Sequence, residues 1–250
     1  MSDFARDAER LRSAKVALRS RVLTARRSLP EAVRRTADRS VQASTLAWLR
    51  AARPTLCAAY VPVGTEPGGP ELPDLLAGRL PAPDAVSPSD DPAVPAAPAA
   101  PAAADAPARG PAAADAVTSS PSPIESRAEA CTVLLPVLLP DGDLDWATHD
   151  GTVRRSPRGL WEPTGRPLGT SAISQADLII VPAVAVSRTG ARLGRGGGSY
   201  DRALARAPSA FVIALLHDGE LLDEVPTEPH DRPVNAVITP ADGLVVLNPR

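Results

Sequence analysis

A glycine-rich segment at residues 192–202 has the composition of an anion-binding loop. It reads Arg-Leu-Gly-Arg-Gly-Gly-Gly-Ser-Tyr-Asp-Arg, with four glycines among the five positions 194–198. Backbone N–H groups in such a loop can converge on an anion because no Cβ atoms obstruct them. Three arginines add positive charge, and the alanine-rich segment 203–207 that follows is expected to be helical, so its N-terminal dipole adds more. We expect the segment to cradle a phosphate.

Two known phosphate-binding patterns do not fit this segment. A P-loop is excluded because no Gly-Lys-Ser or Gly-Lys-Thr follows, and the dinucleotide fingerprint is excluded because Ser199 stands where its third glycine belongs. A glycine-rich turn can also be a plain flexible loop. The three arginines, and the position between a predicted strand at 177–186 and a predicted helix, favour the phosphate cradle.

Carboxylates and aromatic rings near this loop extend the predicted site. Asp201, Asp231 and Glu66 could hold Mg²⁺, which needs only one or two carboxylates in addition to substrate phosphates. None of the three histidines has zinc-ligand spacing. Both tyrosines, Tyr60 and Tyr200, and also Trp161 lie beside loops. Flat rings near a phosphate suit a planar heterocycle, although each ring could instead fill the core.

The first 53 residues are strongly basic and contain the only lysine of the chain, with thirteen Lys and Arg against five Asp and Glu. Apolar residues at helical spacing predict a first helix with one buried stripe: Leu11, Ala14, Leu18, Val22, Ala25 and Leu29. A basic face runs beside it: Arg12, Lys15, Arg19 and Arg26. Capping-box spacing at 28–31 predicts a second helix, with four residues facing inward: Val33, Ala37, Val41 and Trp48.

Four interpretations of the basic face compete. A solvated face is the default. A membrane-surface helix would need bulkier apolar residues opposite, and a transit peptide should lack acids, whereas Asp3, Asp7 and Glu9 are present. Lys15 and Arg19 are i,i+4 neighbours whose like charges repel unless an anion lies between them, so we favour a polyanion site.

Composition excludes several classes of protein. The net charge of −2 gives no global nucleic-acid footprint. No apolar run approaches the roughly 20 residues of a membrane span, and the start has no signal-peptide core. Cys57 and Cys131 are too few for a disulfide framework or a four-cysteine zinc site, and we expect buried, reduced thiols. The sequence therefore predicts a cytoplasmic protein without nucleic-acid or membrane partners, and we also expect a monomer.

Residues 81–128 form a low-complexity insert with 11 prolines and 17 alanines. Bulky apolar side chains are nearly absent, so we expect disorder, because too little surface could be buried to offset the ordering entropy. The insert could link two domains or interrupt one. Residues 1–80 contain too few elements for an independent domain and residues 129–250 lack leading helices, so we expect one domain built from both.

Apolar runs predict a buried sheet from seven segments: 54–63, 131–139, 144–146, 177–186, 210–216, 236–239 and 244–247. Near-continuous apolar runs are typical of strands that are covered on both faces, as in mostly parallel sheets. With helices between the strands, we expect a three-layer α/β/α fold with a mostly parallel, Rossmann-like sheet. Ligands of such folds bind beyond the carboxyl ends of the strands.

These motifs resemble the 5-formyltetrahydrofolate cyclo-ligase family, also called methenyltetrahydrofolate synthetases. The resemblance rests on seven segments: Lys15-x-x-x-Arg19, Val61-Pro62 followed by Glu66, Leu134-Leu135-Pro136, Trp161-Glu162-Pro163, Asp177 to Pro182, Gly190 to Arg202, and Pro226-x-Glu228-x-His230-Asp231-x-Pro233. Order and spacing fit from about residue 12 to 247, except at the insert. Two positions depart from the family: Ser199, where a bulky aromatic is common, and Asn235, where aspartate is usual.

The resemblance implies ATP-dependent cyclisation of 5-formyltetrahydrofolate to 5,10-methenyltetrahydrofolate, with Mg²⁺ and with release of ADP and phosphate. It implies four catalytic residues: Lys15, Arg192, Tyr200 and Asp201. It implies an ATP site: Lys15, Arg19, Arg192, Gly194, Arg195, Gly196, Gly197, Gly198, Ser199, Tyr200, Asp201 and Arg202. It implies a folate site (Tyr60, Val61, Glu66, Trp161 and Glu162) and metal ligands (Asp201 and Asp231). A phosphate-ester or nucleotide-binding protein on the same scaffold, without cyclo-ligase turnover, is the alternative.

Overall fold

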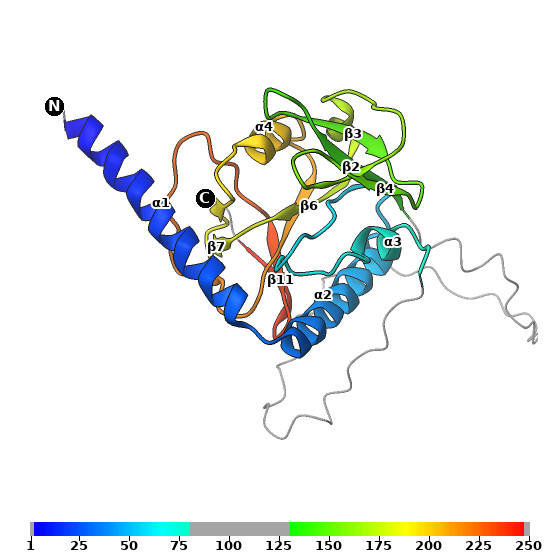
Figure 1. Ribbon diagram of the computed structural model, residues 1–250, viewed down its shortest axis with the longest axis horizontal. Helices are drawn as coiled ribbons and strands as arrows, with labels where there is room; N and C mark the ends of the chain where they lie inside the picture. The colour runs from blue at the N-terminus through cyan, green and yellow to red at the C-terminus, as the bar shows by residue number, and fades with distance from the viewer. Residues whose placement is uncertain (1–2, 81–130, 248–250) are drawn as a thin grey trace, which may run out of the picture. The chain divides into compact units, whose positions relative to one another are not determined.

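The protein is described by a computed structural model that covers residues 3–80 and 131–247 (Figure 1). The predicted insert at 81–128 lies outside the described residues. Two long helices open the chain, α1 (Asp3–Ser28) and α2 (Glu31–Ala52). Three shorter helices follow: α3 (Leu72–Leu76), the 3₁₀ helix η3 (Ala172–Gln175) and α4 (Ser199–Ala205).

Seven strands form the main sheet, in the order β12-β11-β9-β6-β1-β2-β3. Their bounds are β1 (Leu56–Ala58), β2 (Thr132–Leu138), β3 (Leu144–Thr148), β6 (Leu178–Pro182), β9 (Phe211–Leu215), β11 (Ala236–Thr239) and β12 (Gly243–Val246). The five inner strands run parallel, and β3 and β12 pair antiparallel at the edges. The prediction of a mostly parallel sheet is confirmed.

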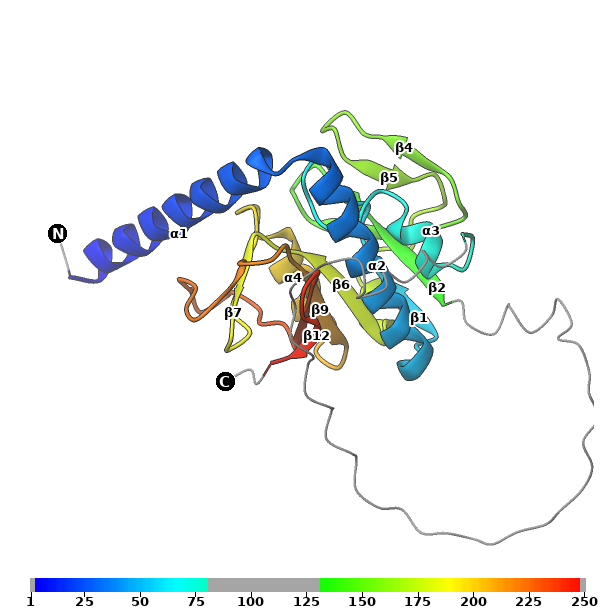
Figure 2. The ribbon, with the colours of Figure 1, turned by 90° about the horizontal axis from the view of Figure 1, so that it is seen from below.

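Helices cover both faces of this sheet (Figure 1 and Figure 2). Along β6, Leu178 and Ile180 pack in the cluster that includes side chains of α2 and α3, whereas Ile179 and Val181 pack in the cluster that includes α4. Successive side chains of a strand point to opposite faces, and all four of these are fully buried. The predicted three-layer α/β/α fold is therefore confirmed.

Two smaller sheets extend the main one. Strands β4 (Val153–Arg155) and β5 (Trp161–Pro163) form a hairpin, and β7 (Ala185–Ser187), β8 (Arg192–Leu193) and β10 (Leu221–Leu222) form a three-stranded sheet.

Two predicted strands are shorter than expected. The segment 177–186 is divided between β6 and β7, because β6 ends at Pro182, which has no N–H for the ladder. The Pro182 carbonyl instead accepts a hydrogen bond from Arg192 Nη1 at 3.2 Å. The segment 54–63 contributes only the three residues of β1. In both cases the chain leaves the sheet early and carries the following residues away from it.

The buried face of α1 is mixed, so the predicted apolar stripe is confirmed only in part. Val22 is buried and Leu18 packs in the same cluster, whereas Ala14 and Ala25 are exposed. Two basic residues, Lys15 and Arg26, are buried beside Val22. Arg26 tolerates burial because its Nε and Nη2 each lie 2.7 Å from an oxygen of Glu220, and Nη2 also donates to the carbonyl of residue 183 at 2.7 Å. Specific partners therefore hold Lys15 and Arg26, whereas Arg12 of the predicted basic face is exposed.

Helix α2 begins near the predicted position, but no capping box forms. Ser28 Oγ donates to the Ala25 carbonyl of α1, and the N-cap residue is Pro30, which makes no side-chain cap. The buried residues of α2 begin at Val41: Val41, Gln42, Thr45 and Leu49. The predicted inward position of Val41 is confirmed. Val33 is 50% exposed, so its predicted inward position is wrong, because the residues of α2 before Val41 are exposed or half-buried.

Cys57 and Cys131 are buried free thiols, as predicted. A hydrogen bond with Cys131, together with burial, raises the pKa of the Cys57 thiol. Within the described ranges, no helix combines the length and the apolar character that a membrane crossing requires.

Arg26→Met is expected to lower the free energy of unfolding by about 3 kcal/mol, because it leaves the buried Glu220 carboxylate without its cation. Urea-induced unfolding measures this change. Arg27→Met, at the exposed neighbouring position, is the control and should change stability by less than about 0.5 kcal/mol. Equal stabilities of Arg26→Met and the wild type would contradict the role given to this ion pair.

Candidate functional site

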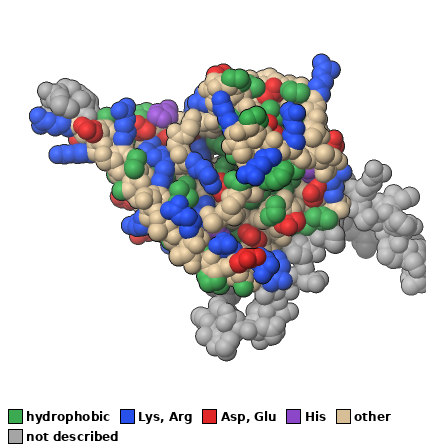
Figure 3. Space-filling view, in the orientation of Figure 1, with side chains coloured by type: hydrophobic (Ala, Val, Ile, Leu, Met, Phe, Trp, Pro, Cys, Tyr) green, Lys and Arg blue, Asp and Glu red, His purple; other side chains and the backbone are tan. Residues whose placement is uncertain are grey.

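A cavity of about 320 Å³ opens beyond the carboxyl ends of β1, β2 and β6. Its lining comes from α1, from the segments after β1 and β6, from β2, β3 and the β4–β5 hairpin, from the loop between β8 and α4, and from residues 228–231. In Figure 3 the visible face is hollowed, with Lys, Arg and hydrophobic side chains around the hollow. Ligands of open α/β sheets bind at this edge of the sheet.

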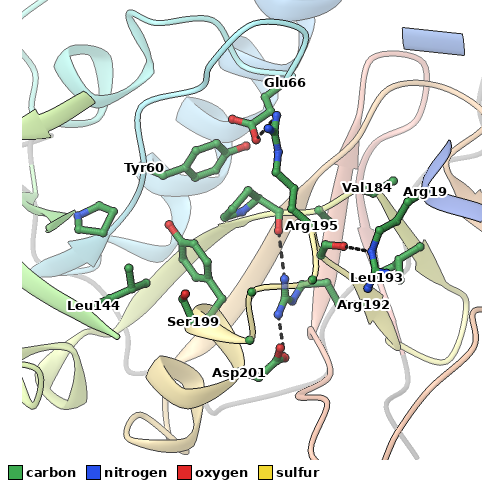
Figure 4. Close-up of a pocket in the computed structure, with 18 of the residues that line it drawn as sticks. Arg19, Tyr60, Glu66, Leu144, Val184, Arg192, Leu193, Arg195, Ser199 and Asp201 are labelled. Atoms are coloured by element: carbon green, nitrogen blue, oxygen red, sulfur yellow. Dashed lines mark hydrogen bonds and ion pairs between the residues drawn. The ribbon is translucent and has the colours of Figure 1, made fainter. Parts of the chain in front are cut away.

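Two glycines of the loop have different structural reasons. A Cβ atom on Gly194 would lie only 2.8 Å from Arg192 Nη1, which is buried. Gly196 has a φ of +103°, a conformation that L-residues rarely adopt. Arg19 Nε donates to the Gly194 carbonyl at 2.8 Å, so α1 and the glycine loop are joined directly (Figure 4).

Lys15 is buried against two carboxylates. Its Nζ lies 2.8 Å from Glu228 Oε2 and 2.6 Å from Asp231 Oδ2. Burial by itself lowers the pKa of Lys15, but the hydrogen bonds and charges of both carboxylates outweigh burial and raise it. The Lys15 hydrogen bond holds the pKa of Glu228 below its usual value. Burial opposes this effect at Asp231, yet the hydrogen bonds from Lys15 and from the Glu228 backbone still lower the pKa of Asp231.

Arg192 is a second buried cation, and Asp201 holds it. Arg192 Nη2 lies 2.8 Å from Asp201 Oδ1, which also accepts a hydrogen bond from the Arg232 backbone at 3.2 Å. Arg192 Nε is buried and has no hydrogen-bond partner in the described part of the chain. Because an unpaired buried donor is costly, this N–H is suited to meet a bound group.

Arg195 extends from the glycine loop to Glu66 (Figure 4). Arg195 Nη2 lies 3.0 Å from Glu66 Oε1, and Glu66 Oε2 accepts a hydrogen bond from the Val63 backbone at 2.9 Å. The Glu66 side chain is 7% exposed, whereas that of Arg195 is 57% exposed. This pair therefore joins a fixed carboxylate to a largely solvated guanidinium.

Two tyrosines lie beside this ion pair. The Tyr60 hydroxyl is buried and lacks a hydrogen-bond partner among the described residues. Burial, and then the charge of Glu66, raises the pKa of Tyr60 well above its usual value, and the same two causes raise the pKa of Tyr200. Both rings are therefore neutral hydrogen-bonding groups at physiological pH.

Apolar side chains form another part of the cavity lining: Pro136, Leu138, Leu144, Leu160 and Trp161. Trp161 is 39% exposed, at the start of β5. Ligand pockets commonly combine such an apolar wall with a few convergent polar groups. An apolar wall with an aromatic ring, together with Tyr60 and Glu66, has the chemistry that suits a flat heterocycle.

The cavity brings together most residues of the predicted site: Lys15, Arg19, Tyr60, Val61, Glu66, Trp161, Arg192, Gly194, Arg195, Gly196, Gly197, Gly198, Ser199, Tyr200, Asp201 and Asp231. Two predicted residues lie outside it. Glu162 is buried and accepts a hydrogen bond from the Leu138 backbone at 3.2 Å, because neighbours on β5 alternate and Trp161 takes the cavity side. Arg202 is exposed and donates to the Gly142 carbonyl at 2.6 Å.

Sequence reasoning did not assign Glu228 or Leu144 to the site. For Glu228 the sequence does contain a usable signal. Glu228 stands three residues before the predicted site residue Asp231, and a second carboxylate there suits an ion pair with Lys15, the single lysine of the sequence. Leu144 carried none, because an apolar residue that opens a strand ordinarily fills the core.

One group of side chains has donor atoms that suit a divalent cation. Glu228, His230 and Asp231 place ligand atoms within 4.8 Å of one another, and Asp201 is not part of this group. Lys15 binds one oxygen of each carboxylate, so a metal ion would use the other oxygens. Mg²⁺ needs few protein ligands when phosphates supply the rest, so the residues fit it.

The two positions that depart from the family are tied to the scaffold. Asn235 Oδ1 accepts a hydrogen bond from the Val212 backbone at 2.7 Å, which connects β9 to the start of β11. Ser199 Oγ donates to the Gly142 carbonyl. Ser199 thereby fixes the start of α4 against the β2–β3 turn.

The chain is similar in sequence to proteins of known family. The model of the 5-formyltetrahydrofolate cyclo-ligase family matches residues 125–240. The 5-formyltetrahydrofolate cyclo-ligase of Mycolicibacterium smegmatis is 37% identical over 235 residues, which cover 92% of this chain and 95% of that protein. The protein of the same name from Escherichia coli is 39% identical over 71 residues, which cover 28% of this chain and 39% of that protein.

Two solved structures share the fold. The 5,10-methenyltetrahydrofolate synthetase of Aquifex aeolicus has a TM-score of 0.60 at 20% identity and covers 94% of both chains. The synthetase of Mycoplasma pneumoniae has a TM-score of 0.57 at 15% identity and covers 89% of this chain and 96% of that one. At these identities the likeness concerns the fold alone.

Asp231→Asn should reduce stability in a pH-dependent way. Because the pKa of Asp231 is lowered in the folded protein, its ionised carboxylate adds to the free energy of unfolding. This stabilisation is fully present above the unfolded-state pKa, about 3.9, and is lost as the pH falls through the folded-state pKa. In urea unfolding at a series of pH values, the difference from wild type should stay constant above about pH 5 and shrink below about pH 4. Asp223→Asn, in an exposed pair, is the control. A difference independent of pH would contradict the Lys15–Asp231 interaction.

Proposed function

We propose that this chain, which belongs to the 5-formyltetrahydrofolate cyclo-ligase family, binds ATP and 5-formyltetrahydrofolate together in the cavity described above. The enzyme is an ATP-dependent ligase of folate one-carbon metabolism that forms 5,10-methenyltetrahydrofolate. We place this reaction in the cavity because a cationic glycine loop and an apolar wall with a buried carboxylate line the same space.

The reaction has two bond-forming steps. The formyl oxygen attacks the γ-phosphorus of ATP, the bond from that phosphorus to the bridging oxygen breaks, and ADP leaves. N10 of the folate then attacks the activated formyl carbon and loses its proton. The carbon–oxygen bond breaks, and inorganic phosphate leaves with the former formyl oxygen.

Positive side chains support a triphosphate at the glycine loop. Arg19 and Arg192 approach the loop from α1 and β8, and Arg195 lies within it. Lys15 adds a buried ammonium. Phosphoryl transfer depends on positioning and on stabilising charge as it develops, and fixed cations in a partly dry cavity supply both.

The reduced folate is proposed to lie against the apolar wall. Tyr60, Val61 and Glu66 would meet the edge of its pterin ring, and Trp161 would cover its face at the mouth of the cavity. Glu162 is not assigned a contact, because its carboxylate binds the backbone of β2. Tyr200 and Asp201 would border the transferring phosphoryl group.

Mg²⁺ is proposed as the cofactor. When bound, it would neutralise phosphate charge on ATP. Asp231, and also Glu228, would hold it through the oxygens that Lys15 does not bind, while Asp201 keeps Arg192 in position.

Residues 1–80 and 129–250 are proposed to act as one domain of a cytoplasmic monomer. The position of β1 between β2 and β6 supports this, since these strands come from both sides of the predicted insert. All proposed substrate contacts belong to one chain.

The activity is tested by absorbance of the conjugated methenyl product formed from 5-formyltetrahydrofolate. Product should appear only when ATP and Mg²⁺ are both present, because the formyl oxygen must be phosphorylated before the ring can close. A folded, ATP-binding protein that makes no product would contradict the proposed reaction and favour a nucleotide-binding protein without turnover.

Arg19→Met is expected to raise the KM for ATP by about tenfold or more, because a charge-assisted hydrogen bond to the triphosphate is lost. The KM for the folate should change by less than about twofold, since Arg19 contacts the glycine loop. Steady-state kinetics with each substrate varied in turn separate the two effects. Arg12→Met, exposed on the same helix, is the control. An unchanged KM for ATP would remove Arg19 from the phosphate site.

A further inference from the structure

We propose that Arg195 couples the two substrate sites. In the ligand-free protein Arg195 holds Glu66, and the triphosphate of ATP draws Arg195 away, which releases Glu66 for the folate. The inference rests on the proposed function, because it takes ATP and 5-formyltetrahydrofolate as the two ligands.

Arg195 differs from the other cations of the cavity in its freedom to move. The side chains of Lys15 and Arg192 are 7% and 3% exposed, so packing fixes them, whereas that of Arg195 is 57% exposed. Arg195 is also flanked by Gly194 and Gly196, which restrict the backbone least. A new anion at the loop can therefore recruit this guanidinium without disturbing the core.

The Arg195–Glu66 pair leaves the folate side of the cavity incomplete. Glu66 Oε2 is bound to the Val63 backbone and Oε1 to Arg195, so both oxygens are engaged. The Tyr60 hydroxyl lies beside this pair in Figure 4, buried and without a partner in the described chain. A substrate donor that takes the place of the Arg195 guanidinium on Glu66 Oε1, next to the Tyr60 hydroxyl, displaces Arg195 from Glu66.

The ion pair therefore links the two binding equilibria. A nucleotide that takes Arg195 removes the competitor for Glu66, so the folate should bind more tightly. Linkage requires the folate to tighten nucleotide binding by the same factor. Without Arg195, Glu66 is released permanently, so the folate alone should bind as tightly as it does to the nucleotide-loaded wild type.

Isothermal titration calorimetry tests this with 5-formyltetrahydrofolate and the non-hydrolysable analogue adenosine 5′-(β,γ-imido)triphosphate with Mg²⁺. In the wild type, saturating analogue should tighten folate binding by about fivefold or more. In Arg195→Ala the folate alone should bind more tightly than to the unliganded wild type, and the analogue should no longer change its affinity. Arg195→Lys, which keeps the charge, should retain part of the coupling.

Arg188→Ala is the matched control, because Arg188 is 65% exposed, pairs with an exposed carboxylate and lies outside the cavity. It should show wild-type coupling. Independent binding of the two ligands to the wild type, or wild-type coupling in Arg195→Ala, would overturn the inference. Analogue binding without any folate binding would overturn the proposed function itself and the inference with it.

Discussion

Four cationic side chains share one small cavity, and their mutual repulsion must be offset before any ligand arrives. The protein offsets it with carboxylates: Glu228 and Asp231 face Lys15, Asp201 faces Arg192, and Glu66 faces Arg195. Arg19 faces a backbone carbonyl. The cavity is therefore close to neutral when empty. A bound triphosphate with its metal ion would take over part of the role that these carboxylates have in the empty cavity.

The same interactions place the N-terminal helix. Val22 of α1 packs in an apolar cluster, and charged groups beside it also find partners on distant segments. Lys15 meets the 228–231 segment, Arg19 meets the glycine loop and Arg26 meets Glu220. Removing one partner of a buried pair is costly, so α1 is held in one position. The docking of α1 and the proposed phosphate site thus depend on the same side chains. The hydrogen bond from Lys15 to Asp231 joins residues that are 216 positions apart in the sequence.

Much of this could be predicted from the sequence, because the strongest signals are local. The apolar strands, the glycine loop and the order of elements follow from composition and period, and the family motifs indicate the site. The burial of Lys15 and Arg26 on α1 could not be predicted, since it depends on carboxylates that only the fold brings near. Glu162 and Arg202 were expected in the site because charged side chains suit a ligand. Their positions on β5 and α4 instead direct them to the backbone of residues 138 and 142.

The central claim is that the formyl oxygen of the folate meets the γ-phosphorus of ATP inside this one cavity. The most direct test is a single-turnover reaction with 5-formyltetrahydrofolate that carries ¹⁸O in its formyl group, followed by mass spectrometry of the released phosphate. We predict one ¹⁸O atom in each inorganic phosphate and none in ADP. Unlabelled phosphate formed together with the methenyl product would contradict direct transfer and, with it, the shared cavity.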